Sequence, residues 1–339
     1  MNNKDLIEKV KQQFCSAEDI AGLLMVESDD KRALFAAADA VRKKYHGERV
    51  KLRGIIEFSN YCANNCWYCG LRADNKNISR YRYSAQEIVD TAKTGIKLGY
   101  GTIVLQAGED NYFDGERIAA IVRSIKQFAD VAITISAGIL RKEEYQLLKV
   151  AGADRYLMKH ETANAELFAK LRPDTTLKER LENLQYLKSL GFWIGSGMMI
   201  GLPGTTIFDV ARDILLLKAT GVEMAGIGPF VAHPSTPLGA DSNGSVELTL
   251  KALAVSRLLM PTVHLPATTA LGTLDKTARV RALMGGANVI MPNISPKSNR
   301  ANYEIYPNKA GTSDDAESSH EMMMKIIADA GRVPALFEK

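Results

Sequence analysis

The feature that most constrains the fold is a regular alternation of short apolar runs with longer amphipathic runs. The strand-like runs are 52–58, 102–106, 132–136, 155–158, 193–199, 224–228, 263–266 and 288–291. The helix-like runs cover about 84–98, 115–128, 141–150, 163–170, 176–190, 206–220, 247–260 and 276–284. Strands that alternate with helices indicate an α/β protein with a parallel sheet. Eight such units predict a complete (β/α)8 TIM-type barrel.

The remaining segments lie at the two ends of the chain. Helical patterns at about 3–14 and 30–46 come before the first strand, and a terminal helix is expected after a polar loop at 310–315. We therefore expect an N-terminal helical extension at 1–48, the barrel at 49–309, and a C-terminal loop and helix at 310–339 that pack on the barrel. One domain of this size is ordinary for α/β barrels.

A cluster of three cysteines follows the first predicted strand. Cys62, Cys66 and Cys69 have C-x₃-C-x₂-C spacing, and the only other cysteine is Cys15. Three thiolates cannot complete a four-cysteine iron–sulfur site. They can bind three irons of a 4Fe–4S cube and leave the fourth iron open to a small molecule. An open coordination position is what a catalytic metal site requires.

Other interpretations of the cysteines fit less well. A disulfide framework leaves an odd thiol and is unnecessary in so long a chain. A zinc site needs a fourth ligand, and no further Cys or His lies between Arg53 and Gln127. A non-catalytic iron–sulfur carrier stays open as an alternative, because the cysteines alone do not require a substrate pocket.

Composition narrows the class of protein. The 339 residues are 46% hydrophobic and 24% charged, with a net charge of only +4. These values are typical of a globular protein, and the small net charge argues against nucleic acid as the main partner. The sequence contains no run of 18 apolar residues, so we expect no membrane span, and the polar N-terminus predicts a cytoplasmic location.

Polar residues follow most of the predicted strands, where the chemistry of an α/β barrel takes place. Gln106, Ser136 and Glu161 are among them. Glu161 is a candidate partner for an ammonium group. Arg180 is a candidate clamp for a carboxylate, because a guanidinium binds carboxylates in a forked geometry. The glycine-rich fifth strand allows a ligand close to the backbone.

The cysteine loop, with Tyr68 before its third cysteine, resembles that of the radical SAM enzymes, in which S-adenosylmethionine (SAM) chelates the open iron. Further blocks resemble the biotin-synthase-like branch and, within it, the HydE-type maturases of [FeFe]-hydrogenase. These blocks are 57–75, 104–110, 151–156, 160–164, 171–175, 227–230 with 233–234, 265–270 and 287–293. They cover roughly residues 50–310 in order.

The resemblance implies a set of functional residues. Cys62, Cys66 and Cys69 would hold one [4Fe–4S] cluster. The residues implied to contact SAM are Tyr68, Gln106, Ser136, Glu161, Arg180 and Met199. Those implied to line the substrate cavity are Arg155, Lys159, Met224, Thr268, Thr269 and Tyr303.

The resemblance also implies an activity. The reduced cluster would cleave SAM to methionine and a 5′-deoxyadenosyl radical, which acts on a cysteine-derived, iron-bound substrate in assembly of the hydrogenase active-site cluster. The implied partners are a small-molecule or organometallic substrate, sister hydrogenase maturases, and an electron donor such as ferredoxin or flavodoxin. Neither nucleic acid nor a membrane is expected.

The chain departs from the family pattern in three places. Residues 312–322 contain none of the extra cysteines that hold a second cluster in many relatives, so we predict one cluster. Ile139 follows the third strand, where many relatives have an acidic residue. Lys159 stands where an arginine is expected, and the two are not interchangeable at a bidentate anion site.

A radical SAM mutase that converts lysine to methylornithine is the nearest alternative. Such an enzyme needs acidic and basic groups in its cavity to bind an amino acid. The apolar pair Ile139-Leu140 and the block Thr268-Thr269 argue mildly against it.

Overall fold

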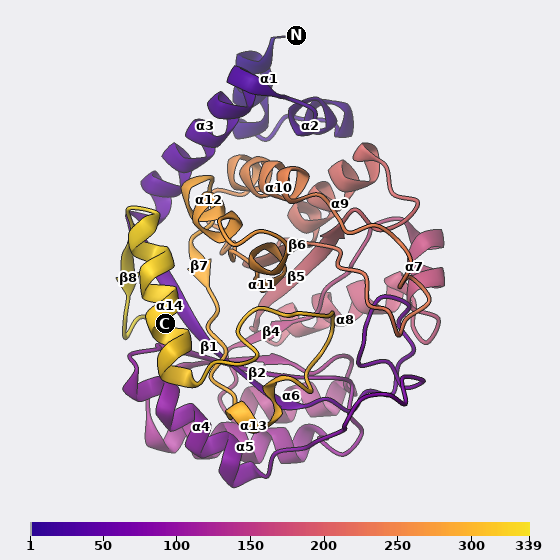
Figure 1. The fold of residues 1–339 in the computed structure, drawn as a ribbon, viewed down its shortest axis with the longest axis vertical. Helices are drawn as coiled ribbons and strands as arrows, with labels where there is room; N and C mark the ends of the chain where they lie inside the picture. The colour runs from indigo at the N-terminus through magenta and orange to yellow at the C-terminus, as the bar shows by residue number, and fades with distance from the viewer. Residues whose placement is uncertain (1) are drawn as a thin grey trace.

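The computed structural model describes residues 2–339 and has a parallel α/β fold built on a curled sheet (Figure 1). Seven strands follow one another in the order β6-β5-β4-β3-β2-β1-β7. They are β1 (Arg49–Ser59), β2 (Thr102–Ala107), β3 (Ala132–Ser136), β4 (Arg155–Leu157), β5 (Trp193–Ile200), β6 (Met224–Pro229) and β7 (Val289–Ile290). All of these pairs are parallel, so the carboxyl ends of the strands share one rim.

Helices follow the strands along the chain, and most of them cover the outer face of the sheet (Figure 1). They are α4 (Ala85–Lys97), α5 (Gly115–Phe128), α6 (Lys142–Val150), α7 (Ala165–Leu171), α8 (Leu177–Ser189), α9 (Ile207–Thr220), α10 (Val246–Leu259), α11 (Thr269–Leu274), α12 (Ala278–Met284) and α13 (Lys297–Arg300). The sequence predicts most of them to within two residues, because Ser, Thr, Asp or Asn side chains cap α4, α5, α7, α8, α9 and α10. It does not predict α11 or α13, which are too short for a periodic pattern.

The prediction of a regular strand at 263–266 is wrong. Only isolated bridges join His264 to Met224 and Pro266 to Val289. Proline has no backbone N–H to donate to a ladder, which weakens pairing at this position. The structure therefore shows a curled parallel sheet and not eight regular strands in a ring.

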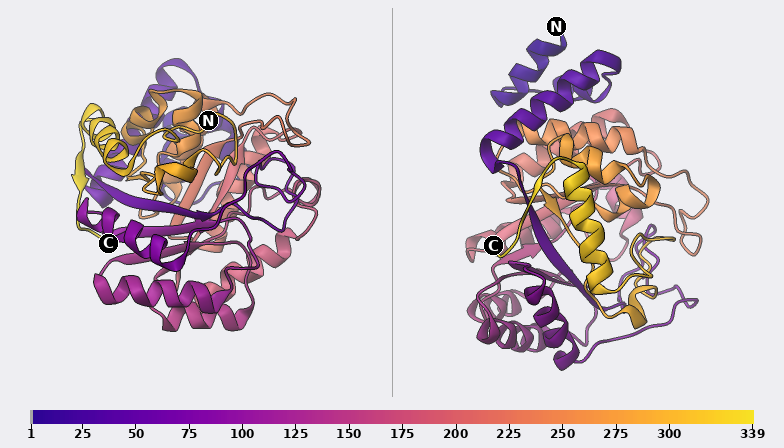
Figure 2. Two further views of the ribbon diagram at one scale, coloured as in Figure 1. Left: turned by 60° about the horizontal axis from the view of Figure 1, so that its bottom comes forward. Right: turned by 60° about the vertical axis from the view of Figure 1, so that its left-hand side comes forward.

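The C-terminal segment adds a strand that the sequence analysis does not predict. After α14 (Ala316–Asp329), the short strand β8 (Val333–Ala335) pairs with the first residues of β1. Figure 2 shows both elements on the outer side of the sheet, beside β1. A run of three residues with a central proline carries too little pattern to be recognised from sequence alone.

Three N-terminal helices precede β1, where two were expected. They are α1 (Asn3–Lys11), α2 (Ala17–Leu24) and α3 (Ser28–His46), and α2 is the one missed. The side chains of Ser16 and Asp19 form a capping box that starts α2. Its buried leucines pack toward α9 and α10, so the extension is part of the hydrophobic core.

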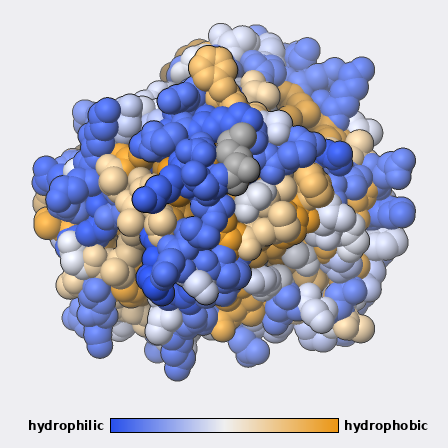
Figure 3. Space-filling model, turned by 90° about the horizontal axis from the view of Figure 1, so that it is seen from above, coloured by the Kyte–Doolittle hydropathy of each residue, from blue (hydrophilic) through white to orange (hydrophobic). Residues whose placement is uncertain are grey.

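The surface mixes charged and apolar residues. Figure 3 shows hydrophilic residues over most of the upper face, with apolar residues in small groups between them. Within residues 2–339, no helix has the length and apolar character needed to span a membrane.

Close packing of β5 on β6 generates a first prediction. Gly197 pairs with Gly226, and a Cβ at Gly197 would lie 2.2 Å from the Gly226 carbonyl oxygen. Gly197→Ala must push the two backbones apart, so we expect a loss of about 1–3 kcal/mol in the free energy of unfolding, as for other overpacked cores. Thermal and denaturant unfolding measure the change.

Gly22→Ala is the matched control. Gly22 lies in helix α2, where an added Cβ would meet only the flexible Leu6 side chain at 3.3 Å. We expect it to be neutral or stabilising by up to about 1 kcal/mol, because alanine favours the helix. Equal stability of Gly197→Ala and the wild type would contradict the packing described for β5.

Candidate active site

The three clustered cysteines lie in an irregular loop at the carboxyl end of β1. Neighbouring segments hold the loop through its backbone. The N–H of Ala63 donates to the Glu109 carbonyl at 2.8 Å, and that of Trp67 donates to the Leu171 carbonyl at 2.9 Å. Part of the loop backbone thus finds hydrogen-bond partners in neighbouring segments, which helps to fix where the thiols lie.

Arg80 and two glycines complete this scaffold. The Arg80 guanidinium donates to four carbonyls of the loop region, among them those of Leu71 at 2.9 Å and Arg72 at 2.7 Å. Gly70, next to Cys69, is so tightly packed that a Cβ would lie 2.1 Å from the Glu304 carbonyl oxygen. At Gly108 a Cβ would lie 2.2 Å from the Tyr61 carbonyl oxygen.

The three thiols are free and mostly buried. Burial raises the pKa of Cys62, raises that of Cys66 to about 11, and raises that of Cys69 further. Neutral thiols are therefore favoured until a metal binds and stabilises the thiolates. No three Cys, His, Asp or Glu side chains among residues 2–339 converge closely enough for a single metal ion.

A network of charged side chains lies beside the cysteine loop. Tyr68 donates from its hydroxyl to Glu161 at 3.2 Å, and Arg172 donates to the Tyr68 hydroxyl oxygen at 2.9 Å. Arg172 also donates to Glu109 at 3.0 Å, and Arg180 lies 3.5 Å from the same carboxylate oxygen. Burial raises the pKa of Tyr68 well above its ordinary value, so the phenol stays protonated and can donate.

Arg172 is the centre of this network. Burial alone would lower the pKa of its guanidinium, but the nearby Tyr68, Cys66, Glu109 and Glu161 outweigh burial and raise it. Arg172 is 6% exposed, so its charge is held in a dry environment where charged hydrogen bonds are strong.

Three atoms of the network have no hydrogen-bond partner within the described residues. They are Glu161 Oε2, Arg172 Nε and Arg180 Nη1, all of them buried, and Arg180 Nη1 has only the ion-pair contact with Glu109 at 3.5 Å. Buried polar atoms are nearly always hydrogen-bonded, so unpaired ones indicate a ligand or water. A free carboxylate oxygen suits an ammonium group, and free guanidinium N–H groups suit a carboxylate. The donor set therefore fits the amino-acid end of SAM.

The backbone at Glu161 is strained. Its φ of 64° is in the left-handed region, which is uncommon for a residue with a side chain. Its N–H donates to the Gly197 carbonyl at 2.9 Å, and its carbonyl accepts from Met199 at 3.1 Å. The neighbouring His160 is buried, with its Nδ1 3.0 Å from Ser196 Oγ and its Nε2 3.7 Å from Asp213. These contacts with β5 and α9 hold the kink that turns Glu161 toward Tyr68.

Several other predicted residues lie along the same rim. Gln106 donates to the Tyr303 hydroxyl at 3.4 Å and pairs with Ser136 at the ends of β2 and β3. Met199 lies near the end of β5. A Cβ built on Gly228 would lie 3.1 Å from Thr268 Oγ1, so Thr268 faces the end of β6.

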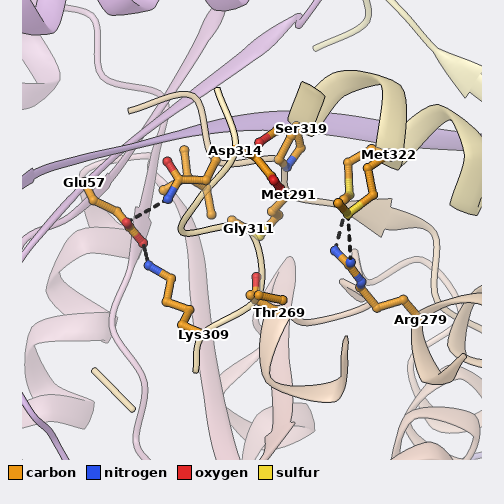
Figure 4. Close-up of a pocket in the computed structure, with 14 residues that line it drawn as sticks. Glu57, Thr269, Arg279, Met291, Lys309, Gly311, Asp314, Ser319 and Met322 are labelled. Carbon is orange, nitrogen blue, oxygen red and sulfur yellow. Dashed lines mark hydrogen bonds and ion pairs between the residues drawn. The ribbon is translucent and has the colours of Figure 1, made fainter. Parts of the chain in front are cut away.

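Lys159 and Thr269 have neighbours outside the charged network. The Lys159 side chain lies against Gly226, because a Cβ built on Gly226 would lie 3.2 Å from Lys159 Cε. The backbone carbonyl of Lys159 accepts a hydrogen bond from Arg180 at 2.9 Å. Thr269 lines a small pocket together with Glu57 and Lys309, which form a buried ion pair (Figure 4).

Arg155 and Met224 are not brought to this rim. They lie at the amino-terminal ends of β4 and β6. Arg155 donates to Thr102 at 3.1 Å, and Met224 accepts from the buried Arg53 at 3.0 Å. These two predicted substrate residues are therefore at the far end of the sheet from the cysteines.

The sequence analysis missed Arg172 and Glu109 as site residues. Glu109 follows β2 on the rim, and a Cβ at Gly138 would overlap its side chain at 1.9 Å. The apolar turn at Ile139 thus leaves room for the carboxylate of Glu109, and the Ile139 N–H donates to it at 3.3 Å. The position of Glu109 after a strand is a usable signal, and Arg172 lies in the block 171–175 that resembles the family, but the resemblance gives Arg172 no role.

Comparison with known proteins identifies the family. The model of the radical SAM superfamily matches residues 56–217, which include the cysteine loop and the charged network. Over 335 residues the chain is 46% identical to the [FeFe] hydrogenase maturase subunit HydE of Thermotoga maritima, covering 98% of this chain and 96% of that protein. The chain belongs to the radical SAM superfamily. It is a HydE-like enzyme that uses a [4Fe–4S] cluster and SAM.

Two methylornithine synthases are also similar. The chain is 32% identical over 304 residues to 3-methylornithine synthase of Methanosarcina acetivorans, covering 88% of this chain and 86% of that protein. The crystal structure of the methylornithine synthase PylB superposes with a TM-score of 0.84 at 29% identity, covering 98% of both chains. The fold is therefore shared across at least two activities of the superfamily.

The cysteines generate a prediction. Replacement of Cys62, Cys66 or Cys69 by serine removes one iron ligand, so we expect cluster binding to fail and SAM cleavage to fall to background. Iron content after anaerobic reconstitution and 5′-deoxyadenosine formation measure this. Cys15→Ser is the control, because Cys15 lies before α2 and outside the loop. Full cleavage by any one of the three loop variants would contradict the cluster assignment.

The charged network generates a further prediction. Arg172→Gln should weaken SAM binding by about tenfold to a hundredfold, the usual cost of losing hydrogen bonds to a charged group. Arg172→Lys should recover only part of this affinity, because lysine lacks the guanidinium fork. Lys170→Gln, at the nearby exposed end of α7, should bind as the wild type does. Calorimetry under anaerobic conditions gives the three affinities.

Proposed function

We propose that this protein reductively cleaves SAM and acts on a cysteine-derived, iron-bound substrate during assembly of the [FeFe]-hydrogenase active-site cluster. The observation that carries the proposal is the 46% identity to HydE over 98% of the chain. When bound, the reduced cluster and SAM supply the 5′-deoxyadenosyl radical. The protein's own residues bind, orient and enclose the reactants.

The cofactor residues are proposed as follows. Cys62, Cys66 and Cys69 hold the cluster, and Glu161 binds the ammonium group of SAM. Arg172 and Arg180 bind its carboxylate. The unpaired atoms of these three charged residues support the assignment. Tyr68, Gln106, Ser136 and Met199 complete the set around the adenosine and the methionyl chain.

The substrate residues are proposed to form one inner cavity. Lys159, Thr268, Thr269 and Tyr303 line its upper part, near the cysteine loop. Arg155 and Met224 lie near its lower end, beside Arg53. Buried cationic groups at that end favour an anionic substrate or product.

We also propose that the barrel is closed and forms one unit at 49–309, with extensions at 1–48 and 310–339. The isolated bridges of His264 with Met224 and of Pro266 with Val289 support closure between β6 and β7. Closure would exclude water from the radical, which otherwise reacts with its surroundings.

A second candidate function is a mutase acting on lysine, as in methylornithine synthesis. The buried ion pair of Glu57 with Lys309, next to Thr269, supports this alternative. It supplies the acidic and basic groups that an amino-acid substrate needs, which the sequence analysis did not find. In this structure, however, the two groups neutralise each other, and Asn293 also donates to Glu57 at 2.8 Å.

A non-catalytic iron–sulfur carrier is the remote alternative. It would have no use for a buried set of unpaired ammonium- and carboxylate-binding groups beside the cysteines. The partners that we propose are sister hydrogenase maturases and an electron donor such as ferredoxin or flavodoxin, in the cytoplasm.

One assay distinguishes the candidates. After anaerobic reconstitution and reduction, 5′-deoxyadenosine is followed with SAM alone, with a cysteine-bound iron carbonyl cyanide precursor, and with L-lysine. We expect strong stimulation by the iron precursor and none by lysine. Stimulation by lysine alone would establish the mutase, and no cleavage by the wild type with an intact cluster would favour the carrier. Cys66→Ser gives the background.

A further inference from the structure

A buried carboxylate that the cofactor and substrate assignments leave unused lies behind the charged network. Asp213 on α9 is 1% exposed, and among the described residues no lysine or arginine pairs with it. A carboxylate in such a place is costly unless hydrogen bonds stabilise it, so its contacts point to its role. Asp213 accepts from the Ala163 N–H and lies 3.7 Å from His160 Nε2. These two contacts lie on either side of Glu161 in the chain.

Glu161 is the central residue of a strained turn. The Thr162 N–H donates to the His160 carbonyl at 2.8 Å, across a residue whose φ is 64°. A hydrogen bond between residues i and i+2 across a positive φ is the rarer and strained form of γ-turn. A non-glycine residue keeps such a backbone only where its surroundings leave no alternative. The contacts around the turn therefore decide where the Glu161 carboxylate points.

The His160 side chain links Asp213 to β5. Its backbone N–H donates to Ser196 Oγ at 3.1 Å, and its Nδ1 lies 3.0 Å from the same oxygen. When Ser196 donates its proton to Nδ1, the His160 proton lies on Nε2 and faces the Asp213 carboxylate. The other tautomer turns a nitrogen lone pair toward the carboxylate, which is unfavourable. Asp213 and Ser196 thus hold the imidazole from opposite sides.

This serine, histidine and aspartate do not form a site for nucleophilic catalysis. Ser196, His160 and Asp213 are each 1% exposed, so no substrate reaches the serine hydroxyl. The serine oxygen also accepts a backbone hydrogen bond already. The three side chains therefore form a support for the backbone that passes through Glu161.

We propose that Asp213 is a positioning residue for SAM, which acts with His160 and Ser196 by holding the turn at Glu161. The inference rests on the proposed role of Glu161 as the partner of the SAM ammonium group. Glu161 Oε1 accepts from Tyr68 at 3.2 Å, while Oε2 is left without a hydrogen bond. Relaxation of the turn would move this free oxygen away from the ammonium group. Asp213 thus acts through Glu161 and not by its own contact with SAM.

The two products of SAM cleavage separate this role from general support of the fold. Methionine carries the ammonium group, and 5′-deoxyadenosine does not. Asp213→Asn should weaken methionine binding to the reconstituted protein by about tenfold, the usual loss for a hydrogen bond to a charged group. It should leave 5′-deoxyadenosine binding unchanged. Anaerobic calorimetry gives both affinities, and equal weakening of the two ligands would overturn the proposal.

Arg212→Gln is the matched control. Arg212 precedes Asp213 on α9, but its side chain is 66% exposed and contacts only Asp209, at 3.7 Å. We expect this variant to bind both ligands as the wild type does. Wild-type methionine affinity in Asp213→Asn would also overturn the proposal.

A double-variant cycle separates this inference from the assignment of Glu161. Glu161→Gln removes the proposed ammonium partner, so adding Asp213→Asn should cause no further loss of methionine affinity. Additive losses would show that Asp213 acts by another route and would overturn the inference alone. Unchanged methionine affinity in Glu161→Gln would instead remove the proposed role of Glu161, and this inference with it.

Two variants of His160 cover the case in which Asp213→Asn does not fold, which thermal unfolding shows. The amide of glutamine reaches the position of Nε2, so His160→Gln keeps a donor toward Asp213. The shorter amide of asparagine reaches only the position of Nδ1, so His160→Asn loses that donor. We expect His160→Gln to bind methionine more tightly than His160→Asn, with equal binding of 5′-deoxyadenosine. Equal methionine affinity of the two would contradict a role for Asp213.

Discussion

Three buried thiols held in a fixed arrangement by an irregular loop are the constraint on which the site depends. The loop has no regular secondary structure of its own, and its buried backbone groups bond to Glu109, Leu171 and Ile305 from three other segments. Arg80 supplies further hydrogen bonds from one side chain. The rest of the fold can therefore be understood as the frame that brings these segments to one rim. Burial within that frame raises the pKa values of the cysteines, so the thiols stay protonated until a metal binds and stabilises the thiolates.

The charged network beside the loop is likewise assembled from separate segments of the chain. Glu109 and Glu161 come from the ends of different strands, and Arg172 and Arg180 come from the segment between β4 and β5. Each carboxylate is partly satisfied by an arginine or by Tyr68, yet unpaired atoms are left toward the interior. A zwitterionic ligand can take these free positions without requiring the network to unfold. In the SAM complex that we propose, this pre-organisation would reduce the cost of binding.

Much of the fold follows from the sequence because local signals agree with it. The capped helices α4, α5, α7, α8, α9 and α10 and the apolar runs of β1 to β6 are recognised, and so is the place of the cysteine loop. The failures have physical causes. The strand β8 has three residues, α2 is a short helix next to another, and Pro266 interrupts the expected strand at 263–266. Sequence patterns depend on length, and these elements are short.

The site residues likewise divide into those that the sequence predicts and those that it does not. Motif spacing finds Cys62, Cys66, Cys69, Tyr68 and Glu161, because they lie in or next to recognisable blocks. Arg172 also lies in such a block, at 171–175, but the sequence assigns it no role, because that role depends on distances to Tyr68 and Glu109 across three segments of the chain. Nor does it find the pairing of Glu57 with Lys309, which are 252 residues apart. Long-range pairing of charges is a property of the folded chain and leaves no local pattern.

The central claim is that three cysteines hold a cluster with one open iron, to which SAM binds directly. The most direct test is electron–nuclear double resonance of the reduced, reconstituted protein with SAM labelled with ¹⁵N at its amino group or ¹⁷O at its carboxylate. The account predicts hyperfine coupling of both labels to the cluster. A four-iron cluster that shows no coupling to either label would contradict it.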